Sequence, residues 1–118
     1  MFDCTRTVYY LALMNDHHPM RDDLRLPDVL LALGNPIRLA AVKQIATGEC
    51  ICSDFVTDVS KSTMTHHWRV LREAGVIRQR PEGRVIYMSL RQDDLEARFP
   101  GLLSAIFNAD QIAPASAP

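Results

Sequence analysis

The chain has 118 residues and a mass of 13.3 kDa, with 13 lysines and arginines against 14 acidic residues and a net charge of −1. This length corresponds to one domain, and a hydrophobic share of 47% is ordinary for a folded soluble protein. No run of about eighteen apolar residues predicts a membrane span, and the mixed start, Met1 to Tyr10, differs from a secretory signal. Three cysteines argue against a disulfide scaffold, so we expect a cytoplasmic protein with no membrane partner.

The charge is distributed unevenly along the chain. Residues 60–91 carry a net charge of +5, whereas residues 1–34, 35–59 and 92–118 carry −2, −1 and −3. Binding to nucleic acid depends on the local field of a surface and not on the average over the chain. The basic block is therefore compatible with a DNA-binding surface, and by charge alone equally compatible with a solvated basic face.

The N-terminal part predicts a helix, a linker and two further helices. Residues 1–15 contain an apolar group suited to a helix, and the polar, proline-containing residues 16–25 are interpreted as a linker. A short helix is expected from Pro27 to about residue 33, where Gly-Asn-Pro ends it. Asn35 is a good N-cap for the next helix, which we expect over residues 36–47.

The clearest predicted helix covers residues 61–74 and ends at Gly75, a common C-cap residue. Before it, residues 49–52 could form a short strand and residues 54–59 a small helix. At about 100° a residue, the long helix separates into an apolar and a polar arc. The apolar arc consists of Met64, His67, Trp68, Val70, Leu71 and Ala74. Because His67 falls on that arc, we interpret it as a core histidine with a hydrogen-bond partner.

Two strands and a further helix complete the predicted fold. Residues 76–80 and 84–90 are expected to form a hairpin whose turn is residues 81–83, with arginines at its tip. Residues 92–109 predict a C-terminal helix, and the Ala/Pro/Ser-rich residues 110–118 predict a disordered tail. The apolar stripe of the C-terminal helix consists of Phe99, Leu102, Leu103, Ile106 and Phe107.

This order of elements is typical of a winged helix-turn-helix, a mainly α fold with a small β-hairpin. A major groove about 12 Å wide admits one helix, and short polar side chains on its outer face let the backbone approach the base edges. Arginines on a hairpin can then reach phosphates or the neighbouring minor groove. Each signal is weak alone, and their order and spacing together are specific.

Three motifs resemble the ArsR/SmtB family of bacterial metal- and stress-responsive repressors. They are ALGNPIRL at residues 32–39, KSTMTHHWRVLREAGVI at residues 61–77 and EGRVIYMSL at residues 82–90. The resemblance covers about residues 26–90. It implies a cytoplasmic, bacterial-type homodimer that binds a palindromic double-stranded DNA operator and represses transcription.

Carried over residue by residue, the resemblance makes residues 62–74 the recognition helix. The DNA-facing residues it implies are Lys61, Ser62, Thr63, Thr65, His66 and Arg69, with Arg80 and Arg84 on the wing. Ser62 is expected to cap the helix as well. The implied dimer interface is formed by the N-terminal residues Tyr9, Tyr10 and Leu13 and by the C-terminal stripe Phe99, Leu102, Leu103, Ile106 and Phe107. A small domain could not bury both apolar groups alone, which agrees with a dimer.

We therefore expect four regions. They are an N-terminal helix and linker for dimerisation (1–25), a winged helix-turn-helix DNA-binding core (26–91), a C-terminal dimerisation helix (92–109) and a tail (110–118).

Cys50 and Cys52 invite a sensor interpretation, because many family members bind arsenite or soft metals through a Cys-x-Cys pair. Cys4 could complete a three-sulfur site for As(III) or a soft divalent metal. Ser53 intervenes before the Asp that follows the pair directly in the family, so the cysteines lie one position early. The harder ligands near the pair are Glu49, His17 and His18. A metal site, a redox thiol switch and two packed thiols all stay open.

Two other classes of function were weighed against a repressor. A winged helix can also act as a protein-interaction module without specific DNA binding, and the negative net charge is compatible with that. An enzyme is not expected, because the sequence has no Gly-rich phosphate loop, nucleophile elbow or paired carboxylates suited to a cleft. A second family metal site, built from Asp and His on the C-terminal helix, is not expected because residues 93–111 contain no histidine.

Overall fold

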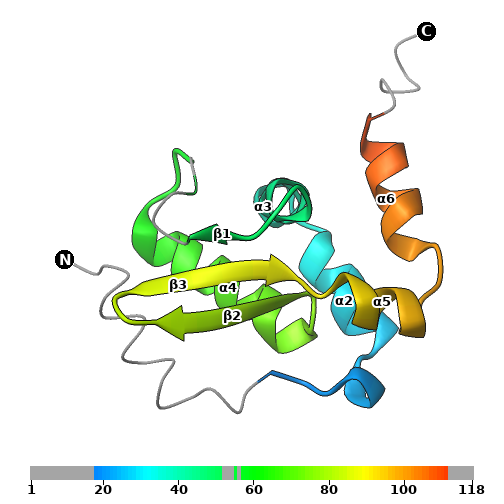
Figure 1. Ribbon diagram of the computed structural model, residues 1–118. Helices are drawn as coiled ribbons and strands as arrows, with labels where there is room; N and C mark the ends of the chain where they lie inside the picture. The colour runs from blue at the N-terminus through cyan, green and yellow to red at the C-terminus, as the bar shows by residue number, and fades with distance from the viewer. Residues whose placement is uncertain (1–17, 52–54, 56, 112–118) are drawn as a thin grey trace, which may run out of the picture.

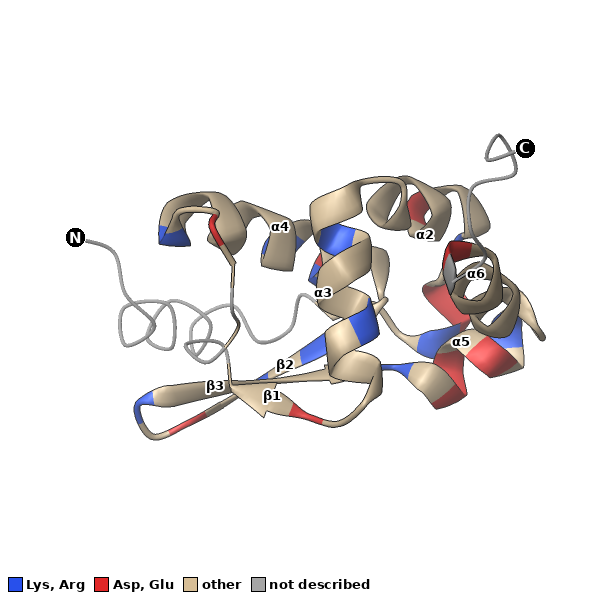
Figure 2. Cartoon of the chain, turned by 90° about the horizontal axis from the view of Figure 1, so that it is seen from above, with Lys and Arg blue, Asp and Glu red and all other residues tan. Residues whose placement is uncertain are grey.

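The computed structural model describes residues 18–51, 55 and 57–111. The elements along these residues are η2 (Arg21–Asp23), α2 (Leu26–Leu33), α3 (Pro36–Ala46), β1 (Cys50–Ile51), α4 (Lys61–Ala74), β2 (Ile77–Glu82), β3 (Val85–Leu90), α5 (Gln92–Arg98) and α6 (Leu102–Gln111). Helices α2, α3 and α4 cover one face of a small sheet, and α5 and α6 lie at one end of it (Figures 1 and 2). The winged helix-turn-helix predicted from the sequence is confirmed.

The sheet is antiparallel, in the order β1-β3-β2. On β2, Ile77 and Gln79 are buried whereas Arg78 and Arg80 are exposed, so the outer face of the hairpin carries the arginines. The turn lies at residues 83–84 and not at 81–83, because β2 runs two residues further than predicted and β3 begins one residue later. Gly83, with φ of 62°, makes the tight turn possible, and proline at position 81 is tolerated because β2 is an edge strand.

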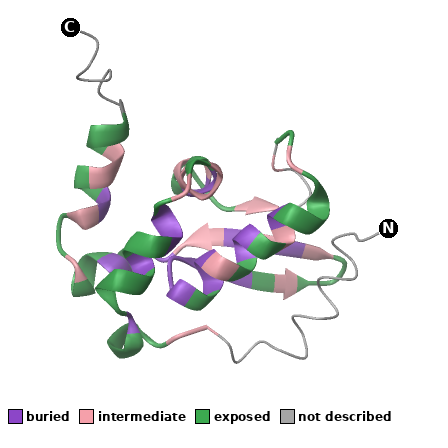
Figure 3. Cartoon of the chain, turned by 180° about the vertical axis from the view of Figure 1, so that it is seen from behind, coloured by how far each residue is buried: buried purple, intermediate pink, exposed green. Residues whose placement is uncertain are grey.

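The core lies between α4 and the sheet and is closed by α2 and α3. The apolar arc predicted for α4 is confirmed: Met64 and Trp68 are 5% and 4% exposed, and Leu71 is fully buried. Buried and exposed residues alternate along α4 accordingly (Figure 3). The largest fully buried side chains are Leu24, Leu71, Ile77, Ile86, Met88, Leu95, Val29, Val42 and Val76.

The helix starts follow local capping chemistry. Asn35 Oδ1 accepts hydrogen bonds from the backbone N–H of Ile37 (2.8 Å) and Arg38 (3.2 Å), as its predicted N-cap role requires. Ser60, and not Ser62, caps α4: its Oγ accepts from the N–H of Thr63 at 3.2 Å. Because Lys61 is already helical, the residue before it is the N-cap, which leaves Ser62 inside the first turn.

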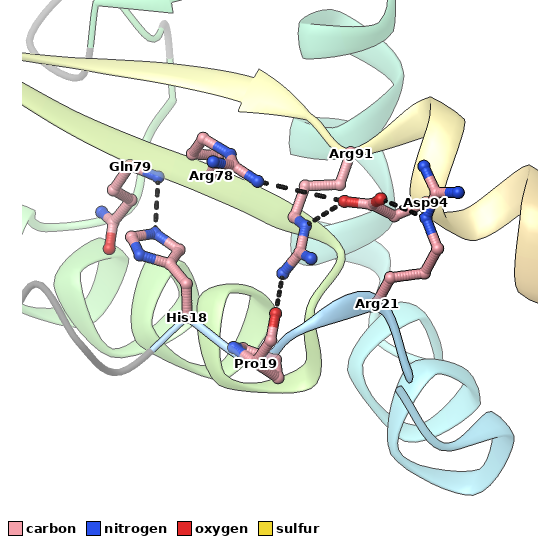
Figure 4. Close-up of polar contacts among 7 residues, drawn as sticks. All are labelled: His18, Pro19, Arg21, Arg78, Gln79, Arg91 and Asp94. Atoms are coloured by element: carbon pink, nitrogen blue, oxygen red, sulfur yellow. Dashed lines mark hydrogen bonds and ion pairs between the residues drawn. The ribbon is translucent and has the colours of Figure 1, made fainter. Parts of the chain in front are cut away.

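Residues 18–24 pack against the domain, although residues 16–25 were interpreted as a linker; we call residues 18–24 the strap. Leu24 is 1% exposed, and Arg98 donates to its carbonyl oxygen at 2.7 Å. Arg91 donates to the carbonyl oxygen of Pro19 at 2.6 Å, and the N–H of Gln79 donates to His18 Nε2 at 3.0 Å (Figure 4). The strap thus covers part of the free edge of β2, which protects an exposed strand edge.

The C-terminal region forms two helices where one was predicted. The hydrogen bond from the N–H of Phe99 to the carbonyl of Leu95 is the last of α5, because Pro100 has no N–H to continue the series. Helix α6 then extends to Gln111, two residues beyond the predicted end, and residues 112–118 lie outside the described residues. Within the described ranges, no single helix is long and apolar enough to span a membrane, and α2 and α3 pass that test only as a pair bent by 99°.

The turn after α4 gives a test of strap packing. Gly75 has φ of 86°, and a Cβ there would lie 2.0 Å from Leu24 Cδ2 and 3.1 Å from Pro19 Cγ. We expect Gly75→Ala to lower the free energy of unfolding by about 2–4 kcal/mol, from left-handed strain plus overpacking. Gly83→Ala is the matched control: φ is 62° but no atom lies within 4 Å, so strain alone should cost about 1 kcal/mol. Equal losses in urea unfolding would show that the strap does not pack there.

Candidate nucleic-acid interface

The outer face of α4 is polar and accessible. Lys61, Ser62, Thr63, His66 and Arg69 are exposed, and Thr65 is half-buried. The N-terminal end of α4 lies at the same end of the molecule as the tip of the hairpin (Figures 1 and 2). The residues that sequence reasoning assigned to DNA contact on α4 therefore share one surface with the wing.

Hydroxyl groups at the start of α4 are partly engaged within the helix. Thr65 Oγ1 donates to the carbonyl of Lys61 at 2.9 Å, and Ser60 Oγ donates to Thr63 Oγ1 at 2.9 Å. The side chains of His66 and Arg69 are left to present polar groups to a ligand.

The two wing arginines differ in their surroundings. Arg80 donates hydrogen bonds to Glu82 and to Glu49 of the segment before β1, and its guanidinium lies 4.4 Å from the centre of the Tyr87 ring. The hydrogen bond to Glu82, followed by that to Glu49, raises the pKa of Arg80. Arg84, in the turn, is exposed and forms no ion pair within the described part of the chain. Arg84 is therefore the more available cation of the wing.

The +5 block of residues 60–91 does not form one continuous basic surface. Arg72 is 3% exposed and donates to Gln79 Oε1 at 2.9 Å, and Arg91 is 6% exposed beside Asp94. Among the residues of the block that the structure describes, Lys61, Arg69 and Arg84 are exposed without a carboxylate partner. Sequence reasoning missed the pairing of Arg80 with Glu49 because the two are 31 positions apart.

Arg38, on α3, connects α2 to α4. From the first turn of α3, Arg38 Nε donates to the carbonyl of Ala32 at 2.6 Å and Nη2 to that of Leu31 at 3.3 Å. Both carbonyls lie in the last turn of α2, where the carbonyl of Leu31 also accepts from the N–H of the C-cap residue Gly34 at 3.3 Å. Nη1 lies 3.2 Å from His67 Nδ1 on α4. Because a guanidinium can only donate, Nδ1 is the acceptor and His67 is neutral with its proton on Nε2.

The core assignment of His67 is thereby confirmed, with Arg38 as its partner. Burial of the ring, followed by the charges of Arg38 and His66, lowers the pKa of His67 below its usual 6.5. The residue holds α4 against α3 and is 6% exposed, so it takes no part in the outer face.

Comparison with known proteins agrees with this geometry. No protein-family model matches the chain. YceK of Bacillus subtilis (strain 168), an uncharacterised HTH-type transcriptional regulator, is 30% identical over 89 residues, which are 72% of this chain and 89% of YceK. A crystal structure of a possible transcriptional regulator for arsenical resistance has a TM-score of 0.56 and 30% identity, covering 73% of this chain and 86% of that one. An ArsR family transcriptional regulator has a TM-score of 0.58 and 21% identity, covering 75% and 93%.

The chain belongs to the ArsR family of transcriptional regulators. The resemblance read from its three motifs is confirmed. Its relatives are DNA-binding transcription factors and not enzymes, which agrees with the expected class of function.

The thiol site suggested by the ArsR resemblance is only partly within the described residues. Cys50 is half-buried, pairs with Met88 across β1 and β3 and so shares the core-facing side of the sheet. Its Sγ lies 3.4 Å from the carbonyl oxygen of Gly48. Cys4, Cys52 and His17 lie outside the described residues. His18, one of the suggested harder ligands, accepts a hydrogen bond from the N–H of Gln79.

The predicted dimer residues also lie partly outside the residues that the structure describes. Tyr9, Tyr10 and Leu13 lie outside the described residues. Leu103 is buried in the core of its own chain, whereas the rest of the C-terminal stripe is half-buried and packs on the edge of that core. Helix α6 is also held to α3 by an ion pair between Lys43 and Asp110.

The neutral state of His67 predicts a pH dependence. Its pKa is lowered on folding, so the unfolded chain binds more protons, and stability is lost as the pH falls below about 6.5. His67→Gln keeps an acceptor for Arg38 but cannot titrate. We expect the unfolding free energy of the variant to fall less than that of the wild type between pH 7.5 and 5.5 in urea titrations. Parallel pH curves for the two proteins would contradict the Arg38–His67 contact.

Proposed function

We propose that the protein is a repressor that binds a palindromic DNA operator as a homodimer and is released by an effector. The observation that supports this proposal is the polar outer face of α4, where Lys61 and Arg69 make no ion pair to a described residue; the start of α4 lies at the same end of the molecule as the turn between β2 and β3, which contains Arg84. A helix of this kind enters the major groove, and a cation on the wing reaches a phosphate or the minor groove.

Homodimer formation is supported by α6. Leu102, Ile106 and Phe107 are half-buried on a helix that is attached to the domain at its start and by the ion pair of Lys43. A second copy would cover these side chains by helix-on-helix packing, and a two-fold dimer matches the symmetry of a palindromic operator. The two recognition helices then read two half-sites about one helical turn apart.

DNA binding should depend on the unpaired cations. On the proposed DNA surface, Lys61, Arg69 and Arg84 make no ion pair to a described residue, which gives six such cations in a dimer, so the slope of log Kobs against log salt should be about −5. On a duplex found by in vitro selection, Arg69→Ala should weaken binding by about 5- to 150-fold, the loss of one base or phosphate contact. Fluorescence anisotropy across salt concentrations measures both values.

The matched control is Arg25→Ala, which removes an exposed arginine between the strap and α2 that makes no ion pair within the described part of the chain. It should bind within about twofold of the wild type, and all three proteins should sediment at about twice 13.3 kDa. If binding has no salt slope, or if both variants lose the same affinity, the recognition-helix assignment is wrong. A protein-interaction module then becomes the better interpretation.

The proposed effector is a soft metal or metalloid held by thiolates, As(III) being the clearest case, or an oxidant acting on the same thiols. Within the described residues Cys50 supplies one sulfur, so such a site also needs Cys52 and Cys4. Adding As(III), Cd(II), Zn(II) or peroxide to the DNA complex should release the wild type. Cys52→Ser should bind DNA normally and stay bound; a variant that is still released would exclude the thiols as sensor.

A further inference from the structure

A polar pocket lies at the base of the hairpin, where the strap, β2, β3 and α5 meet; we call it the base pocket. Its volume is about 460 Å³. The charged and hydroxyl side chains that line it are Arg21, Arg78, Ser89, Arg91, Asp93 and Asp94. Figure 4 shows Arg21, Arg78 and Arg91 arranged around Asp94. Three separate segments of the chain thus bring three guanidinium groups to one place.

The carboxylate at the centre of this group is fully engaged. Arg21 Nε donates to Asp94 Oδ1 at 2.7 Å, Arg91 Nε donates to Oδ2 at 2.9 Å, and Arg78 Nη2 lies 3.9 Å from the same oxygen. The hydrogen bond from Arg21, together with that from Arg91, lowers the pKa of Asp94. A carboxylate surrounded in this way has no role left as a ligand for a cation, so the pocket does not suit a metal ion.

Hydrogen-bond donors remain in excess around that carboxylate. Within the described residues, Arg78 makes no side-chain hydrogen bond, and Arg21 uses only Nε. Ser89 is the direct cross-strand partner of Arg78 and makes no side-chain hydrogen bond to a described residue. The lining carries three positive and two negative charges, so the pocket has a net positive charge as well as unused N–H and O–H donors.

The base pocket is separate from the proposed DNA surface. Arg78 and the turn at Gly83 lie at opposite ends of β2, five residues apart, which is about 16 Å of strand. Helix α5 lies at the end of the molecule opposite the wing tip (Figures 1 and 2). An anion drawn to this pocket is therefore not the phosphate contacted by α4 or the wing.

We propose that the base pocket binds a small oxyanion, a phosphate or carboxylate group of a low-molecular-weight compound. Arg78 and Arg21 would each offer a planar fork of N–H donors, a geometry that fits both groups, and Ser89 would add its hydroxyl. The bound anion would join the strap to the hairpin base and to α5. The site does not depend on the proposed function, because DNA contact uses other residues.

Calorimetric titration of the full chain with inorganic phosphate and with succinate, in a chloride buffer without other oxyanions, tests the proposal and tells the two chemistries apart. We expect saturable binding of one of them at millimolar concentration or tighter. Arg78→Gln should weaken binding at least fivefold, because it removes the charge and the fork of N–H donors proposed to hold the anion. Since the Arg78 side chain is half-exposed, the substitution should leave the fold intact. Arg25→Gln, which removes the same charge outside the pocket, should stay within about twofold of the wild type.

Three results would overturn the proposal. One is the absence of binding by either probe to the wild type. Another is an equal loss in Arg25→Gln, which would mean that only overall charge attracts the anion. The last comes from measuring DNA binding by the same variant: Arg78→Gln should bind duplex DNA within about twofold of the wild type. If it loses as much affinity as Arg69→Ala, Arg78 belongs to the DNA surface instead.

Discussion

The contact of Arg38 with both of its neighbouring helices is the constraint on which the rest of the structure depends. One guanidinium satisfies two terminal carbonyls of α2 and donates to His67 of α4. The buried imidazole of His67 and the carbonyl of the buried Ala32 would each be costly without a partner. Because Arg38 meets both needs from the first turn of α3, the angle between α4 and the helices before it depends on polar geometry as well as on packing.

Helix α4 can present a polar face because its opposite face is held so firmly. Met64, Trp68 and Leu71 are anchored in the core, and Arg72 is tied to Gln79 of β2. Among the outer residues, the hydroxyl groups of Thr63 and Thr65 bond within the first turns of the helix, whereas the side chains of His66 and Arg69 make no hydrogen bond to a described residue. This division is what a DNA-reading helix requires: a rigid support and short, adaptable polar groups on the outside.

Arginine serves three different purposes in this chain. Arg69 and Arg84 are exposed and make no ion pair to a described residue, Arg80 pairs with Glu82 and Glu49, and Arg91 is buried with Asp94. Arg91 also holds the strap to the sheet by donating a hydrogen bond to the carbonyl oxygen of Pro19. The strap in turn covers the edge of β2 and closes one wall of the base pocket. A local count of charges cannot separate these purposes, since it does not contain the positions of the carboxylates.

The sequence by itself determined the local features of the fold. The period of α4, the cap at Asn35, the end at Gly75 and the core position of His67 all follow from interactions within a few residues, and all were predicted. The cap was expected at Ser62, two residues late, because two serines, Ser60 and Ser62, could each cap the helix. Which of them does so depends on where the backbone changes from extended to helical, and that change comes directly after Ser60.

Only the tertiary structure decided how distant segments meet. The bond of Arg91 to the strap carbonyl of Pro19, the pairing of Arg80 with Glu49 and the bond of Arg21 to Asp94 join residues 31 to 73 positions apart. Such contacts have no periodic signal, because they depend on where the folded elements bring side chains in space. The base pocket exists for the same reason: no single segment of this chain contains it, and folding assembles it from three.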